Sequence, residues 1–243
     1  MHLFRRLSLL LIVWGVGLST FSVARTPDPV AHVRVSLFDD AHVPPATLAL
    51  AQARASFIFS QSGIVLDWLA CPSPDPADFR PSRSACSDLS WPGHLSVRVI
   101  SRGRNVGPDI FGQAFVDDSG CGVYSNVYYQ NLASSRSLGL TEGDMLGYVL
   151  AHEIGHLLLG SNSHSTTGLM QAHWNATTLH EAFHSTLFFT PAQAATLHSR
   201  LSRASTDLAQ ASPVLVVASS RPSVGITTIA AGLGVYTYKP RIE

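Results

Sequence analysis

The stretch His-Glu-Ile-Gly-His at residues 152–156 lies inside an apolar run that extends from residue 145 to residue 159. Successive residues of an α-helix turn by about 100°, so His152 and His156 lie one turn apart on one face and can both bind a single metal ion. Glu153 is rotated by about 100° from His152, which places it poorly as a third ligand but allows it to hold a metal-bound water. The stretch therefore predicts a buried zinc-binding helix in which Glu153 is the general base.

The flanking residues predict where this helix begins and ends. Thr141 is a candidate N-cap with Asp144 three residues further on, and Gly160 is placed to end the helix. The apolar stripe that would be buried is formed by Leu146, Val149, Leu150, Leu157 and Leu158.

The same histidine spacing occurs a second time, in the stretch His-Glu-Ala-Phe-His at residues 180–184. A motif this short matches by chance, so its surroundings have to separate the two copies. The first copy lies in an apolar helix rich in small residues and is followed by His164, a candidate third ligand. The second copy is followed by the bulky run Leu-Phe-Phe at residues 187–189 and has no comparable arrangement. We therefore assign the metal to the first copy.

Residues 152–164, followed by Gly-Leu-Met at residues 168–170, resemble the signature of the metzincin zinc peptidases with its Met-turn. The usual pattern has its glycine three residues, and its third histidine six residues, after the second histidine, whereas Gly160 and His164 come four and eight residues after His156. Asn162 occupies the usual position of the third ligand, and asparagine is a poor zinc ligand beside histidine. The resemblance is closest to a divergent, bacterial-type branch with a longer loop. It implies Zn²⁺ held by His152, His156 and His164, with Met170 as a hydrophobic floor.

These observations predict an exported zinc-dependent endopeptidase that acts on a protein or peptide substrate. One alternative is a gluzincin-type zinc hydrolase in which Glu181, on a later helix, replaces His164 as third ligand. Another is a catalytically inactive binding module on the same fold, against which the intact Glu153 argues. His173 is a further competing ligand, because it follows the Met-turn closely and imidazole suits zinc.

The hydrophobic periods predict an α+β fold. Apolar residues alternate over residues 30–38, as in a half-buried strand, and a helical pattern over residues 46–61 follows two prolines. Further strand-like runs occupy residues 64–69, 95–100, 114–116 and 123–129, and a capping box at residues 190–193 starts a last helix over residues 194–204. The metzincin resemblance implies a twisted mixed sheet over a backing helix, with the zinc helix beneath it. It also offers the strand at residues 124–129 as the one that pairs with substrate; the alternative is a plain core strand.

Composition limits the domain organisation and the partners. Lys plus Arg and Asp plus Glu both number 16, and no basic cluster occurs in the mature chain, so we expect no nucleic-acid partner. Residues 25–205 are expected to form one metallopeptidase domain. Residues 206–243, rich in Ser, Pro, Ala and Gly without a clear period, are expected to form a weakly ordered tail.

Residues 1–24 have the features of a secretory signal peptide: two arginines, an apolar stretch at residues 7–18, and Ser-Val-Ala before the cleavage site. An uncleaved membrane anchor is the alternative, although an apolar run of about 12 residues is short for a span that needs about 20. No later stretch is long and apolar enough to cross a membrane. We expect a secreted or periplasmic protein.

The cysteine spacing agrees with export. Cys71 and Cys86 flank a Pro-, Ser- and Asp-rich insertion, and in an exported protein two cysteines that close a short loop usually form a disulfide. Cys121 is then left over as an inert small residue or as a thiolate near the metal, and alternative pairings of the three cysteines remain open.

Overall fold

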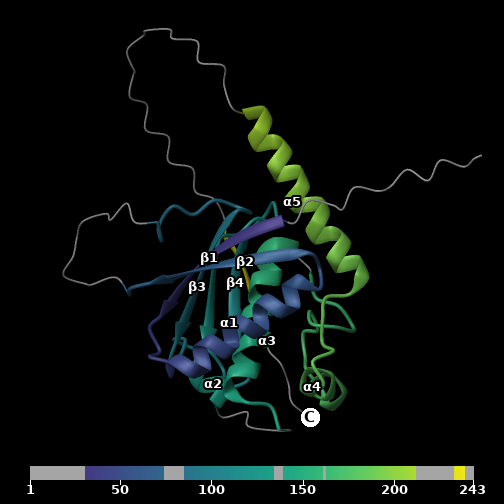
Figure 1. The fold of residues 1–243 in the computed structure, drawn as a ribbon. Coiled ribbons are helices and arrows are strands. Elements are labelled where there is room, and N and C mark those ends of the chain that lie inside the picture. The colour runs from purple at the N-terminus through teal and green to yellow at the C-terminus, as the bar shows by residue number, and fades with distance from the viewer. Residues whose placement is uncertain (1–30, 74–84, 134–138, 161–162, 212–232, 239–243) are drawn as a thin grey trace, which may run out of the picture.

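The computed structural model describes residues 31–73, 85–133, 139–160, 163–211 and 233–238 (Figure 1). Its elements in chain order are β1 (Ala31–Asp39), α1 (Pro45–Ser60), β2 (Ile64–Cys71), β3 (His94–Ile100), β4 (Gly112–Asp117), β5 (Tyr124–Tyr128), α2 (Tyr129–Ala133), α3 (Glu142–Leu159), α4 (Ala176–Phe183), α5 (Pro191–Ala211) and β6 (Leu233–Tyr238). The predicted α+β class is confirmed. The predicted signal peptide, residues 1–24, lies outside the described residues.

The strands form one mixed sheet in the order β2-β1-β3-β5-β4-β6. Strands β2, β1, β3 and β5 run parallel to one another, whereas β4 runs antiparallel to both β5 and β6. The register places Val35 opposite Trp68 on one side and Leu95 on the other. Because side chains alternate along a strand, this register gathers the apolar residues of β1 and β3 on one face.

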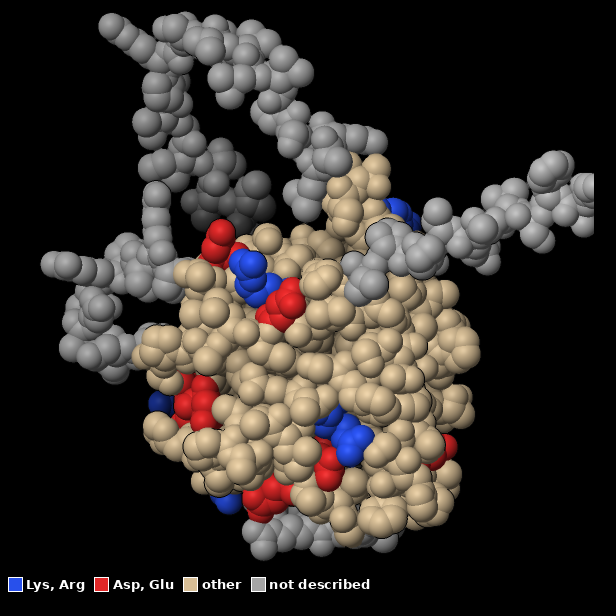
Figure 2. All heavy atoms as spheres, viewed as in Figure 1, with Lys and Arg blue, Asp and Glu red and all other residues tan. Residues whose placement is uncertain are grey.

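That apolar face is covered by α1 and α3, which lie side by side across the strands (Figure 1). Val33, Val35, Val97 and Val99 are fully buried there. The opposite face carries polar residues such as Arg34, Ser36 and Arg98 at the alternate positions. On the view in Figure 2, acidic and basic side chains occur next to each other in small groups.

Helix α3 begins and ends where the sequence predicts. Thr141 is the N-cap: its Oγ1 accepts a hydrogen bond from the Asp144 backbone N–H at 3.0 Å and donates one to the Asp144 carboxylate at 2.7 Å. Gly160 is the C-cap with φ 88°, a conformation that favours glycine. Nearly every residue between the caps is buried, which is the position of a central core helix.

Helices α1 and α3 are joined by a close approach and an ion pair. A Cβ placed on Gly147 would lie 2.8 Å from the Ala51 carbonyl oxygen, so only glycine permits this distance. Arg54 donates from Nε and Nη2 to the same Asp144 carboxylate oxygen, at 3.0 and 2.7 Å. Asp144 thus fixes the first turn of α3 both to its own N-cap and to α1.

The C-terminal part of the chain differs from expectation in two places. The capping box at Thr190 and Gln193 is present, but α5 continues to Ala211 instead of ending near residue 204. Within the segment 206–243, expected to be weakly ordered, residues 233–238 form β6 on the outer edge of β4. Their sequence, Leu-Gly-Val-Tyr-Thr-Tyr, contains β-branched and aromatic residues that suit a strand once an edge is there to pair with.

Cys71 and Cys86 form the predicted disulfide, with their Cα atoms 6.0 Å apart. Most of the insertion that this bond closes, residues 74–84, lies outside the described residues. Cys121 is a free, partly exposed thiol. A search of the helices in the described part of the chain found none with the length and apolar character of a membrane span.

The Asp144 carboxylate gives a stability prediction. Burial alone would raise the pKa of Asp144, but hydrogen bonds from Thr141 and Arg54 and the charge of Arg54 outweigh burial and lower it below its ordinary value. Asp144→Asn should therefore lower the free energy of unfolding by about 1–2 kcal/mol at pH 7. A group with a lowered pKa stabilises the folded state above its unfolded pKa of about 3.9. The difference from wild type should shrink as the pH falls below that value.

Urea unfolding at pH 7 and pH 3 measures this effect. Asp67→Asn is the matched control, because the Asp67–His32 pair is largely exposed, at 52% and 60%. Its change should stay within about 0.5 kcal/mol. Equal losses for the two variants at pH 7 would contradict a special role for Asp144.

Candidate metal centre

The structure brings the three predicted histidine ligands together. His152 and His156 come from adjacent turns of α3, and their Nε2 atoms lie 3.0 Å apart. His164 comes from the segment after the helix, and one ligand nitrogen from each of the three residues lies within 4.8 Å of the others. His152 and His156 are buried, at 0% and 3% exposure, while His164 is more exposed.

The outer nitrogens of the two helical histidines are both bound. His152 Nδ1 lies 2.9 Å from the Leu169 carbonyl oxygen, and His156 Nδ1 lies 2.7 Å from Ser163 Oγ. A carbonyl oxygen only accepts, so Nδ1 of His152 carries the hydrogen and its Nε2 presents a lone pair. This is the arrangement that orients a metal-binding imidazole.

Burial keeps the histidines neutral. It lowers the pKa of His152 to about 3, and with the neighbouring His152 and His164 it holds the pKa of His156 well below its ordinary value. The pKa of His164 is also lowered, by burial and then by His173. Neutral imidazole is the form that binds a metal ion.

Glu153 lies inside the protein without a hydrogen-bond partner among the described residues. Its side chain is fully buried, and neither carboxylate oxygen is bonded. Burial raises the pKa of Glu153 well above its ordinary value. The carboxylate lies against the backbone of β4, since a Cβ placed on Gly112 would be 2.3 Å from Glu153 Oε1. A buried carboxyl group of this kind needs a polar partner, which a metal-bound water would supply.

These residues fit a zinc ion. With Zn–N distances of about 2.0–2.1 Å and tetrahedral angles, two ligand nitrogens lie roughly 3.3 Å apart. The observed separation of His152 Nε2 and His156 Nε2, 3.0 Å, is close to this value. Three neutral imidazoles with a nearby carboxylate leave a fourth position for water, as in catalytic zinc sites.

Met170 lies directly behind the metal-binding face of α3. It is fully buried, and a Cβ placed on Gly155 would be 2.7 Å from its sulfur atom. The Ser165 N–H donates to the Met170 carbonyl at 2.9 Å, and Gly168 has φ 75°, so residues 165–170 form a tight turn. This turn also positions Leu169, whose carbonyl binds His152.

The competing ligands lie elsewhere. The second motif is on α4, where Thr178, Leu179 and Ala182 face the core and His180 and His184 are exposed. Among the described residues, Glu181 and His173 do not belong to the cluster formed by His152, His156 and His164, although His173 lies near enough to His164 to lower its pKa. Asn162 lies outside the described residues. The geometry favours His164 over Glu181 as the third ligand.

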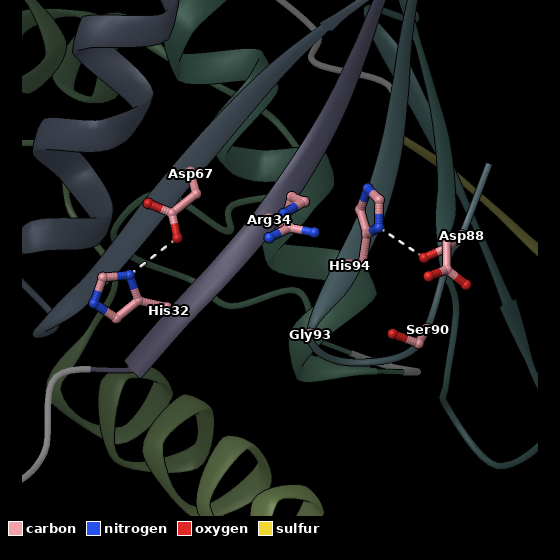
Figure 3. Close-up of a pocket in the computed structure, with 7 residues that line it drawn as sticks. All are labelled: His32, Arg34, Asp67, Asp88, Ser90, Gly93 and His94. Atoms are coloured by element: carbon pink, nitrogen blue, oxygen red, sulfur yellow. Dashed lines mark hydrogen bonds and ion pairs between the residues drawn. The ribbon is translucent and has the colours of Figure 1, made fainter. Parts of the chain in front are cut away.

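A separate hollow lies on the polar face of the sheet (Figure 3). His94 is satisfied there, with Nε2 2.8 Å from Ser36 Oγ and Nδ1 2.7 Å from the Asp88 carbonyl oxygen. His32 and Asp67 pair with each other at 3.0 Å. The hollow carries both charge signs and lies on the opposite face of the sheet from α3.

The strand that flanks Glu153 is β4, not the strand at residues 124–129. Strand β5 is bonded to β3 on one side and to β4 on the other, so it has no free edge and cannot pair with substrate. Of the two interpretations of residues 124–129, the structure therefore supports the plain core strand and not the substrate-pairing strand. Chain order indicated a strand just before the zinc helix, but sheet order is set by non-local pairing and places β4 outside β5.

Comparisons with known proteins give matches to solved structures only. The chain is similar to archaemetzincin from Methanopyrus kandleri, with 17% identity and a TM-score of 0.45, over 73% of this chain and 99% of that one. It is also similar to metalloproteinase-II from Bacteroides fragilis, with 13% identity and a TM-score of 0.41, over 71% of this chain and 54% of that one. No family model matches the chain, and no curated protein sequence matches it.

The ligand set can be tested by metal binding. His164→Ala should weaken zinc binding by orders of magnitude, because it removes one of three converging imidazoles. His180→Ala and Glu181→Ala should leave tight binding almost unchanged. Zinc competition titration with a chromophoric chelator measures all three proteins. Loss of zinc in Glu181→Ala with retention in His164→Ala would support the gluzincin ligand set instead.

Proposed function

We propose that this chain is an exported zinc-dependent endopeptidase. The observation that carries the proposal is that three converging, neutral histidines lie beside a buried carboxylate that has no hydrogen-bond partner in the described part of the chain. A purely structural zinc site has four protein ligands and no bound water, so it does not require a carboxylate beside the metal.

His152, His156 and His164 would hold Zn²⁺. A bound zinc ion would act as a Lewis acid and would lower the pKa of a coordinated water. Glu153 would take a proton from the attacking water onto its carboxylate and pass it to the amide nitrogen as the peptide C–N bond breaks. The Leu169 carbonyl and Ser163 hold the two helical imidazoles in orientation, and the surrounding apolar side chains exclude other water.

A peptide substrate is suggested by the surroundings of Glu153. The carboxylate lies against the backbone of β4 at Gly112, and β4 is at one of the two edges of the sheet formed by residues 31–128. A strand edge binds extended polypeptide backbone through main-chain hydrogen bonds. A peptide on this edge would have its amide groups next to Glu153.

Export is part of the proposal. It is supported by the signal-like sequence of residues 1–24 and by the Cys71–Cys86 disulfide, since such bonds persist in oxidising compartments. The mature enzyme would comprise the metallopeptidase domain, residues 25–205, and the segment 206–243, in a secreted or periplasmic location.

The proposed role of Glu153 is tested by Glu153→Gln. The variant should keep zinc near one ion per chain, because the ligands are untouched, and should lose peptide hydrolysis by at least about 100-fold. Glu181→Gln is the matched control, because it makes the same change in the second motif, and it should keep full activity. Metal analysis and hydrolysis of an unstructured protein substrate give the two readouts. Undiminished turnover by Glu153→Gln would refute the mechanism, and zinc binding without hydrolysis in the wild type would favour an inactive binding module.

A further inference from the structure

Strand β6 occupies the edge of β4 beside Glu153. Residues Leu233–Tyr238 run antiparallel to Gly112–Asp117, with Tyr238 opposite Gly112. Gly112 is the residue against which the Glu153 carboxylate lies. The C-terminal end of β6 is therefore next to the backbone that flanks the proposed general base.

The direction of the β4 backbone groups follows from one hydrogen bond. The Tyr128 N–H donates to the Phe111 carbonyl at 2.8 Å, so residue 111 is bonded towards β5. Backbone groups of successive residues point to opposite sides of an antiparallel strand. The N–H and C=O groups of Gly112, Ala114 and Val116 therefore face the outer edge, where the register places Tyr238, Tyr236 and Gly234 opposite them.

An extended peptide that added to this edge would need the same backbone groups. Without β6, the outward groups of β4 would be an open edge, which is the usual template for strand addition. With β6 in place these groups are paired, so β6 and a substrate strand exclude each other. Residues 212–232 connect β6 to α5, so β6 competes for this edge as part of the same chain and a substrate competes as a separate molecule.

We propose that residues 233–238 act as an internal occupant of the substrate edge and restrain peptide hydrolysis until they leave it. This inference rests on the proposed peptidase function. In this role the C-terminal segment is an inhibitor that binds as a strand. Its binding surface is the set of outward-facing backbone groups of Gly112, Ala114 and Val116.

Two proline variants of the full chain separate this role from a general disturbance. In Tyr236→Pro the lost N–H is the one that faces Ala114, so β6 should leave β4. In Val235→Pro the lost N–H faces away from β4, where an edge strand tolerates proline. The second variant is a matched control one residue away.

Two readouts do not depend on catalysis. Hydrogen exchange should show the outward amides of Gly112, Ala114 and Val116 protected in wild type and in Val235→Pro, and exposed in Tyr236→Pro. A labelled peptide, Leu-Gly-Val-Tyr-Thr-Tyr, should bind Tyr236→Pro about tenfold more tightly than wild type, the factor expected if about a tenth of wild-type molecules have an open edge. Hydrolysis of a peptide substrate should rise in Tyr236→Pro by a similar factor and be inhibited by the added hexapeptide.

The outcomes distinguish the two proposals. Fast exchange of the β4 amides in wild type, or equal hexapeptide binding by all three proteins, would overturn the docking of β6. If hydrogen exchange of the β4 amides changes as expected but wild type and Tyr236→Pro hydrolyse the peptide equally fast, the proposal that β6 restrains hydrolysis would be overturned. The expected exchange and binding with no hydrolysis by any protein would leave β6 as the occupant of this edge, and would overturn both its role as an inhibitor and the proposed peptidase function.

Discussion

The buried, neutral imidazoles of His152 and His156 need hydrogen-bond partners, and the rest of the site is built around this need. His152 and His156 are removed from water, which lowers their pKa values and leaves polar nitrogens that each need a partner. Their outer nitrogens find the Leu169 carbonyl and Ser163. The chain after α3 therefore has to fold back onto the helix, and in doing so it brings His164 to the same place and Met170 behind Gly155.

The position of α3 against the sheet decides what Glu153 can do. Helix α3 is held at its first turn by Thr141 and Arg54 and approaches α1 closely at Gly147. With the helix fixed in this way, the residue after His152 points at β4, where Gly112 leaves room for a carboxylate. A side chain at position 112 would occupy the space of Glu153. The site therefore needs both α3, which supplies Glu153, and β4, which supplies the space at Gly112, although the two are far apart in sequence.

Local features of the site could be predicted from the sequence, and non-local ones could not. The helix ends, the clustering of His152, His156 and His164, and the disulfide were predicted from capping residues, histidine spacing and cysteine spacing, all of which act over short distances. The interior position of β5 and the outer position of β4 depend on strand pairing between distant segments, which alternation does not reveal. The role of Gly112 had one available signal, a glycine within a strand, which often marks a close approach. The pairing of β6 had a weak signal, because its six residues do not show which strand edge they pair with.

The second histidine motif shows why the spacing alone does not make a site. His180 Nε2, on α4, and His184 Nε2, at the C-cap of that helix, lie 3.1 Å apart, nearly the same distance as the 3.0 Å between His152 and His156. One helical turn sets this distance in both places, so it does not distinguish them. What differs is the surroundings: α4 exposes its two histidines, with no third ligand among the described residues. The pair on α3 is buried, Leu169 and Ser163 bind its outer nitrogens, and the Glu153 carboxylate lies on the same helix. The chemistry proposed for the first motif therefore depends on the packing of residues 112 and 163–170 against α3, which the pattern His-Glu-x-x-His does not contain.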